Sequence, residues 1–248
     1  MLDRIAATRR PDESPIGYQT WTRLAFLHWR VSPEQLRSLL PKGLEIDTFD
    51  GSAWLGLVPF YMSGVRPWWS PAVPGVSNFP ETNLRTYVHR RGAHPGVWFF
   101  SLDATKRLAV WLGRTFWHLN YKHAQMSLEQ TGDRVCYHSL RNDGVTRLDL
   151  ELQCDPLPPG VTDGVAAEPG SLEFFLAERY LLYTTNRSGR LYRGQVHHRP
   201  YPLRPAQVVS CRQTLSAANG IDVADRPDHA LFSPGVTVDI FPLRPVES

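Results

Sequence analysis

The sequence predicts a mainly β fold, a closed or nearly closed antiparallel β-barrel with a few short helices. About a dozen runs rich in β-branched and aromatic residues are separated by Gly, Pro, Asn and Asp turn signals. Only three segments place apolar residues at helical spacing. Closure is expected because it removes the exposed edges that so many strands would otherwise present. The 248 residues, 42% of them hydrophobic, are ample for one sizeable core.

The first elements follow a polar, proline-containing stretch. We expect residues 1–17 to form a flexible N-terminal arm and residues 18–248 to form a single domain. The aromatic and β-branched run 21–31 predicts a strand. Ser32 as N-cap and Pro33 at the first helical position then predict a short amphipathic helix that stops at Pro41.

Two strands are predicted at residues 44–49 and 53–65, joined as a hairpin by the turn dipeptide Asp50-Gly51. The next stretch, 66–80, holds prolines and the adjacent tryptophans Trp68 and Trp69, a composition that excludes a regular strand or helix interior. We expect it to be a structured loop over a pocket mouth or against a neighbouring subunit.

The middle of the chain predicts two neighbouring strands, a helix and a return to strand. The strands are expected at 83–88 and 96–102, and the helix within 104–117. Lys122 would then lie at a helix-to-strand junction.

The remaining elements are hairpin-like units and one further helix. A serine cap and helical spacing predict a short helix within 171–180. The strand-rich segments are 124–140, 145–154, 181–197, 208–215 and 236–241.

Composition excludes several classes of function. The net charge is +3 and no basic stripe is present, so nucleic acid is not an expected partner. The N-terminus lacks a secretory pattern and no run approaches the ~18 apolar residues of a membrane helix, so we expect a cytoplasmic protein with no membrane contact. Nucleotide-binding and nucleophile-elbow motifs are absent, and no cofactor is expected. The three cysteines are widely spaced, so we expect no disulfide framework. The histidines do not have the spacing of metal-binding motifs, so we expect no metal site.

The segment 113–123 is crowded with aromatic and cationic side chains and contains one of only three lysines, Lys122. An amine among apolar walls and positive groups loses its proton readily, which is the condition for a Schiff-base lysine. The alternative is a strand-end lysine that extends its ammonium group to water. His123 beside it is a candidate general base, and His118 is a further candidate for the same site.

Five phrases occur together between residues 21 and 206. They are Pro33-x-x-Leu36-x-x-Leu39-Leu40-Pro41-x-Gly43-Leu44, Asp47-x-Phe49-x-Gly51-x-Ala53-Trp54, Asn83-x-Arg85-Thr86-Tyr87-Val88, Phe99-Phe100-Ser101-Leu102-Asp103, and Phe175-Leu176-x-Glu178-Arg179-Tyr180-x-Leu182-Tyr183. Together they resemble the uncharacterised YqjF-like family of the acetoacetate-decarboxylase-like superfamily. The resemblance implies that superfamily's swollen, cone-like β-barrel around a central cavity.

The resemblance also tests the chemistry. Decarboxylases of the superfamily carry a motif like G-R-E-x-x-G-F-P-K-K, in which the first lysine forms the Schiff base and the second lowers its pKa. On this chain Gly-Arg falls on Gly113-Arg114, the first lysine position on Tyr121 and the second on Lys122. Without the first lysine that mechanism has no nucleophile, so acetoacetate decarboxylase activity is not expected.

Polar residues of two neighbouring strands are the candidate ligand contacts. Period-2 alternation places Arg85 and Tyr87 on one face of their strand, and Ser101 and Asp103 on one face of theirs. If both faces point inward, they line the barrel interior near Lys122. The alternative is a structural ion pair of Arg85 with Asp103 or Glu81.

Three hypotheses follow. The first is a pocket for a small carboxylate- or carbonyl-bearing molecule, with Arg85 as the anion anchor and Lys122, Tyr121 and Tyr87 polarising a carbonyl. The second is a lyase or aldolase-like enzyme with Lys122 as the Schiff-base lysine, which requires a bulge near residues 120–121 to turn Lys122 inward. The third is a non-catalytic interaction domain that uses Trp68 and Trp69. A homo-oligomer is compatible with each.

Overall fold

The computed structural model describes residues 2–246, which form thirteen strands, three α-helices and two short 3-10 helices. The strands are β1 (Gly17–Val31), β2 (Glu45–Ile46), β3 (Ala53–Pro67), β4 (Phe79–Arg90), β5 (Ala93–Ala104), β6 (Tyr121–Thr131), β7 (Arg134–Arg141), β8 (Arg147–Cys154), β9 (Leu181–Thr185), β10 (Leu191–His197), β11 (Arg204–Gln213), β12 (His229–Ile240) and β13 (Arg244–Pro245). The helices are α1 (Pro33–Arg37), α2 (Arg107–Phe116), α3 (Leu172–Ala177), η1 (Ala6–Thr8) and η2 (Ala217–Asn219).

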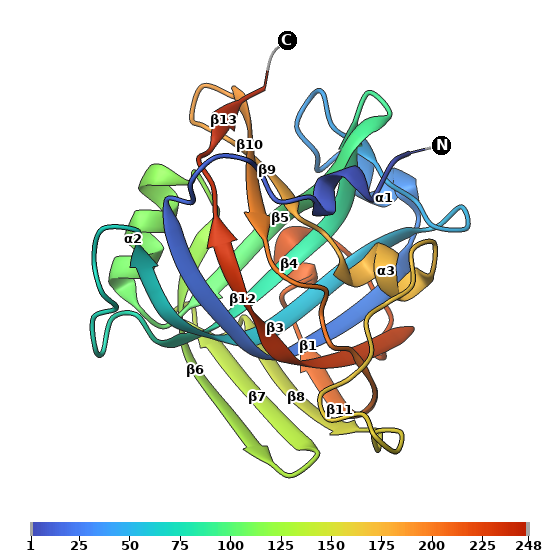
Figure 1. The fold of residues 1–248 in the computed structure, drawn as a ribbon. Helices are drawn as coiled ribbons and strands as arrows, with labels where there is room; N and C mark the ends of the chain where they lie inside the picture. Colours follow the sequence, from blue (N-terminus) through green and yellow to red (C-terminus); the bar gives the residue numbers. More distant parts are fainter. Residues whose placement is uncertain (1, 247–248) are drawn as a thin grey trace.

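The strands form one large sheet that closes into two circuits (Figure 1). Both circuits share the run β12-β1-β3-β4-β5. The first is closed by β9 and β10, because β9 pairs with β5 and β10 pairs with β12. The second is closed by β6, β7, β8 and β11, because β6 pairs with β5 and β11 pairs with β12. The ring-like, mainly β prediction is therefore confirmed.

Two pairings depart from the antiparallel rule. Strand β5 pairs in parallel with β6 and with β9. Parallel neighbours need a crossover connection, and α2 provides it between β5 and β6. The same helix therefore lies against the start of β6, close to Tyr121.

The shared strands bury both of their faces, one in each circuit. On β1, Leu24 and Phe26 join one cluster of apolar side chains, which includes Val196 of β10. The alternate residues Ala25 and Leu27 join a second cluster, which is completed by side chains of β7 and β8. Period-2 alternation thus sends neighbouring residues of one strand into two different interiors.

All three predicted helices are formed, and two of them begin at the predicted serine caps. Ser32 accepts a hydrogen bond from the backbone N–H of Gln35, and Ser171 accepts one from Phe174. Helix α2 occupies most of the predicted 104–117 segment. None of the helices formed by residues 2–246 is long and apolar enough to cross a membrane.

One predicted hairpin is wrong. Asp50 and Gly51 do form a tight turn, with backbone hydrogen bonds between Phe49 and Ser52. However, β2 pairs with β4 and not with β3. The reason lies at Asp47, whose backbone N–H donates to the carbonyl of Tyr87 and whose carboxylate is held by Arg179. The first contact holds the end of β2 against β4, and the second fixes it to the segment after α3.

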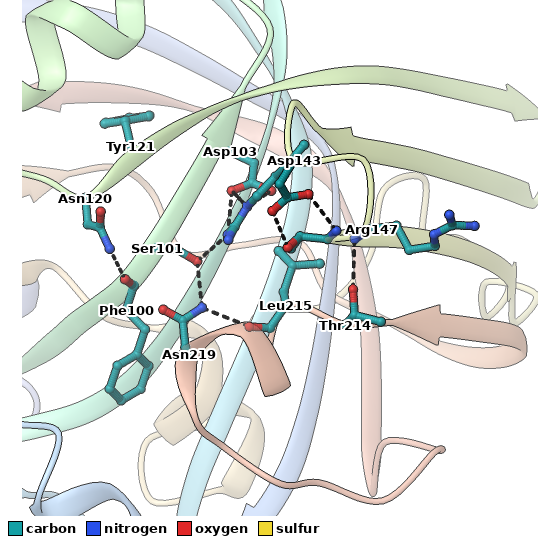
Figure 2. Close-up of polar contacts among 12 residues, drawn as sticks. Phe100, Ser101, Asp103, Asn120, Tyr121, Asp143, Arg147, Thr214, Leu215 and Asn219 are labelled. Carbon is teal, nitrogen blue, oxygen red and sulfur yellow. Dashed lines mark hydrogen bonds and ion pairs between the residues drawn. The ribbon is translucent and has the colours of Figure 1, made fainter.

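A buried ion pair ties the second circuit together (Figure 2). The Nε atom of Arg141, on β7, lies 2.9 and 3.0 Å from the two carboxylate oxygens of Asp103, on β5. Its Nη2 atom donates to the hydroxyl of Ser101, which also accepts from the amide of Asn219. Asp103 is 1% exposed and Arg141 is 8% exposed, so this charge pair is shielded from water on both sides.

We expect Arg141→Met to lower the free energy of unfolding by about 3 kcal/mol, because it leaves the Asp103 carboxylate buried without a partner. Arg134→Met is the matched control on the same strand, since Arg134 forms an exposed ion pair with Glu151. Urea denaturation of both variants measures the difference. Equal effects of the two substitutions would contradict a special role for the buried pair.

Candidate functional site

A cavity of about 660 Å³ lies inside the first circuit. Its walls come from β1, β3, β4, α2 and the segment that follows α3. Most of the lining side chains are apolar, and the polar groups among them include the buried Glu81, Asn83, Arg85 and Arg179 and the half-buried Tyr121. A largely apolar cavity with a few convergent polar groups is the usual form of a small-molecule site.

Strand β4 delivers three of these polar groups. Glu81, Asn83 and Arg85 are two residues apart, so period-2 alternation points all three into the cavity. Tyr87 continues the same face, but it lies outside the lining and is completely buried under α3. Its hydroxyl group donates to the carbonyl of Leu176 and contacts Nε2 of His28 at 2.7 Å.

Arg85 is a buried cation without a counter-charge. It is 8% exposed, and its Nη2 atom donates to the carbonyl of Leu176 at 3.0 Å. Among residues 2–246 no carboxylate lies within ion-pair distance of it, and its Nε atom has no partner. The structural alternative is therefore not formed, because Asp103 pairs with Arg141 and Glu81 bonds to Tyr121.

A second guanidinium group lies at the same end of the cavity. Arg179 donates to Asp47 at 2.8 Å, while its Nη2 atom is buried with no partner among the described residues. Both Arg85 and Arg179 lie against the ring of Tyr87, at 5.7 and 5.0 Å from its centroid. Arg4, from the N-terminal arm, shares the Asp47 carboxylate. Arg4 and Arg179 thus share one carboxylate, while Arg85 at the same end has none within ion-pair distance among residues 2–246, so this end carries surplus positive charge.

Glu81 and Tyr121 form a neutral pair on the cavity wall. The Tyr121 hydroxyl group donates to a Glu81 carboxyl oxygen at 2.9 Å. Burial raises the pKa of Glu81 to about 8, partly offset by the Tyr121 hydrogen bond, and burial also raises the pKa of Tyr121. At neutral pH neither group carries a charge, so Glu81 does not neutralise Arg85.

Helix α2 fixes the position of Tyr121. Gly113 lies directly on the tyrosine ring, where an added Cβ would be only 2.4 Å from a ring carbon. The next residue, Arg114, donates from Nε to the Tyr121 carbonyl at 2.8 Å. The Gly-Arg pair of the sequence motif therefore holds the residue at the first lysine position, and Arg114 itself lies outside the lining.

Lys122 faces away from the cavity. It pairs with Asp103 in the β5-β6 register, which is continuous across Tyr121, Lys122 and His123. Alternation therefore sends Tyr121 inward and Lys122 to the opposite side. Partial burial lowers the pKa of Lys122, with further lowering by Arg114 and Arg141 and an opposing effect of Asp103. The bulge that a Schiff-base role requires is not formed in this register.

The other predicted site residues also lie elsewhere. Nδ1 of His123 contacts the side chain of Asn142, and the ring of His118 lies 5.4 Å from that of Tyr192. Ser101 and Asp103 face the second circuit, not the interior that holds Arg85. The pairing of β4 with β5 shifts between Leu84/Ser101 and Arg85/Phe99, which leaves Phe100 as an extra residue in β5. This shift puts Ser101 and Asp103 on the opposite side of the sheet from Arg85.

Of the predicted residues, the structure brings Arg85, Glu81 and Tyr121 together at the cavity. Arg179 was not predicted as a contact, although it lies in the phrase Glu178-Arg179-Tyr180 and two of those residues line the cavity. The sequence feature that could have indicated Arg179 is its position just after a short helix with a serine cap. Among residues 2–246, no cluster of three or more His, Cys, Asp or Glu side chains is arranged to hold a metal ion.

Comparison with known proteins agrees with this architecture. The chain is 40% identical to the uncharacterized protein YqjF of Bacillus subtilis over 234 residues, 94% of each chain. Acetoacetate decarboxylase from Legionella pneumophila shares the fold, with a TM-score of 0.64 at 13% identity over 98% of this chain and 92% of that one. An acetoacetate decarboxylase-like enzyme from Sphingomonas wittichii has a TM-score of 0.65 at 13% identity over 95% of each chain. The enduracididine biosynthesis enzyme MppR has a TM-score of 0.63 at 13% identity over 96% of this chain and 93% of that one. Residues 18–237 match the model of DUF2071, an uncharacterized conserved protein, and the chain belongs to that family.

Proposed function

We propose that this chain binds an organic molecule with a carboxylate or carbonyl group in the cavity, and that Arg85 anchors its oxygen atoms. The observation that carries the proposal is a buried arginine that lines a cavity and has no carboxylate partner within residues 2–246. An unpaired buried charge costs free energy, which an anionic ligand would recover. The planar guanidinium group also matches a carboxylate in a bidentate geometry.

The neutral Glu81-Tyr121 pair supports the same ligand class. Because the Tyr121 hydroxyl group donates to Glu81, the O–H of the protonated Glu81 carboxyl group is left to donate to a carbonyl oxygen. Neither repels an anion while Glu81 stays protonated. The cavity therefore combines a cation for the acid group with a neutral donor for a second oxygen.

A protein of similar fold supports this chemistry by analogy. MppR was solved in complex with pyruvate, a small acid that carries both a carboxylate and a carbonyl group. At 13% identity the likeness concerns the fold, so the ligand class rests on the residues of this chain.

We expect Arg85→Met to weaken binding of pyruvate and octanoate by roughly 10- to 100-fold, because it removes a charge-assisted contact. Folding should be preserved, since the Leu176 carbonyl still accepts from Tyr87. Isothermal titration calorimetry measures the affinity and thermal unfolding measures the stability. Arg107→Met is the matched control, because Arg107 is exposed on α2 and lies outside the cavity lining. Unchanged affinity in Arg85→Met would refute the anchor.

The affinity for these anions should also depend on pH through Glu81. Its carboxyl group stays neutral below its pKa of about 8 and ionises as the pH rises through that value. The new negative charge then opposes the bound anion, so affinity should fall severalfold between about pH 7 and about pH 9.

Glu81→Gln keeps the shape of the side chain and cannot ionise. Calorimetric titrations of this variant across the same pH range should give a nearly constant affinity. A similar decline in the wild-type protein and in Glu81→Gln would show that another group is responsible.

A further inference from the structure

The cavity is elongated along β4. Phe79, Glu81, Asn83 and Arg85 all line it, and the first and last are six residues apart. At about 3.3 Å per residue, this wall alone extends for roughly 20 Å. A small acid such as pyruvate, anchored at Arg85, would contact only the inner part of such a wall.

The outer part of the cavity is apolar and open. The loop 68–78 precedes β4, and α2 follows the strand that pairs with it, so both lie near the Phe79 end (Figure 1). The large apolar side chains that both line the cavity and are exposed are Ile16, Trp69, Val73, Val76, Leu108, Leu112 and Phe116. Exposed apolar side chains in continuity with a cavity are typical of a binding groove.

The inner end has the opposite chemistry. Arg85 is hydrogen-bonded to Leu176 of α3, and Arg179 follows that helix. Leu176 is completely buried, so α3 closes this end. The cavity therefore has cations at a closed end and apolar side chains at an open one, with the neutral pair Glu81 and Tyr121 between them.

We propose that the ligand of this cavity is an amphiphile, a carboxylate with an extended apolar tail. The carboxylate lies at Arg85 and Arg179, and the tail follows β4 outward to the opening between α2 and the loop 68–78. This inference rests on the proposed function for its anion contact and adds the tail. Covering the apolar walls lowers the free energy only when the occupant is itself apolar, and the gain is proportional to the apolar area removed from water.

A series of straight-chain carboxylates from acetate to dodecanoate tests the proposal. Affinities are measured by calorimetry, or by displacement of octanoate for the weakest members, below the concentrations at which the longer acids form micelles. Each added methylene should strengthen binding roughly fourfold until the tail reaches the opening. Affinity that does not change with chain length, or that falls, would overturn the amphiphile and leave the Arg85 anchor in place.

Two variants on α2 locate the tail. Leu112 lines the cavity and is 40% exposed, whereas the adjacent Trp111 is 55% exposed and lies outside the lining. Leu112→Asp should weaken dodecanoate binding at least fivefold and leave acetate unchanged. Trp111→Asp should alter neither. Equal effects of the two variants on dodecanoate would overturn the proposed path of the tail.

Arg85→Met separates the two proposals. If affinity for the wild type rises with chain length and Arg85→Met weakens every member of the series by the same factor, both the anchor and the tail stand. If short and long acids bind equally well to the wild type and both depend on Arg85, only the tail is lost. If no acid binds, or if binding is indifferent to Arg85→Met, the proposed function itself fails and the amphiphile with it.

Discussion

The structure depends on one constraint, that five shared strands must bury both of their faces. A sheet with only one interior would leave half of the β1, β3 and β4 side chains in water. Here β9 and β10 cover one face, and β6, β7, β8 and β11 cover the other. One covered space contains the cavity of about 660 Å³. The other contains the buried Arg141-Asp103 ion pair, which joins β7 to β5 across the intervening strand β6. The functional role assigned to a side chain therefore depends on which of the two circuits it points into.

Charge is distributed unequally between these interiors. In the second circuit, the charged side chains Arg141 and Asp103 satisfy each other. In the first, Arg85 has no counter-ion among residues 2–246, and Arg179 shares its only carboxylate with Arg4. Balanced charge is compatible with a structural role, whereas unbalanced charge in a lined cavity favours a role in binding. The contrast between the two interiors of one protein strengthens the interpretation that Arg85 and Arg179 have a role in binding.

Much of the fold could be predicted from local sequence patterns. Caps at Ser32 and Ser171 and the periodicity of residues 104–117 defined the helices, because those signals act within a few residues. The site was harder to predict, because the side on which a strand residue lies depends on register. Phe100, as an extra residue in β5, is enough to separate Ser101 from Arg85. Likewise Lys122 follows Tyr121 by one position, and only the β5-β6 pairing decides which of them faces the cavity. Arg85 lies on the cavity wall, on the same side as Glu81, because β4 alternates without interruption between them.

The contact between Arg4 and Asp47 has a practical consequence for anyone who handles this protein. Arg4 comes from the first residues of the chain, yet its guanidinium group reaches the carboxylate that also holds Arg179. An affinity tag or a proteolytic nick near the N-terminus can withdraw that cation from Asp47, which would then pair with Arg179 alone. Preparations that differ only in their leading residues would then differ in the electrostatic potential felt by a bound acid, even though the rest of the polypeptide is identical.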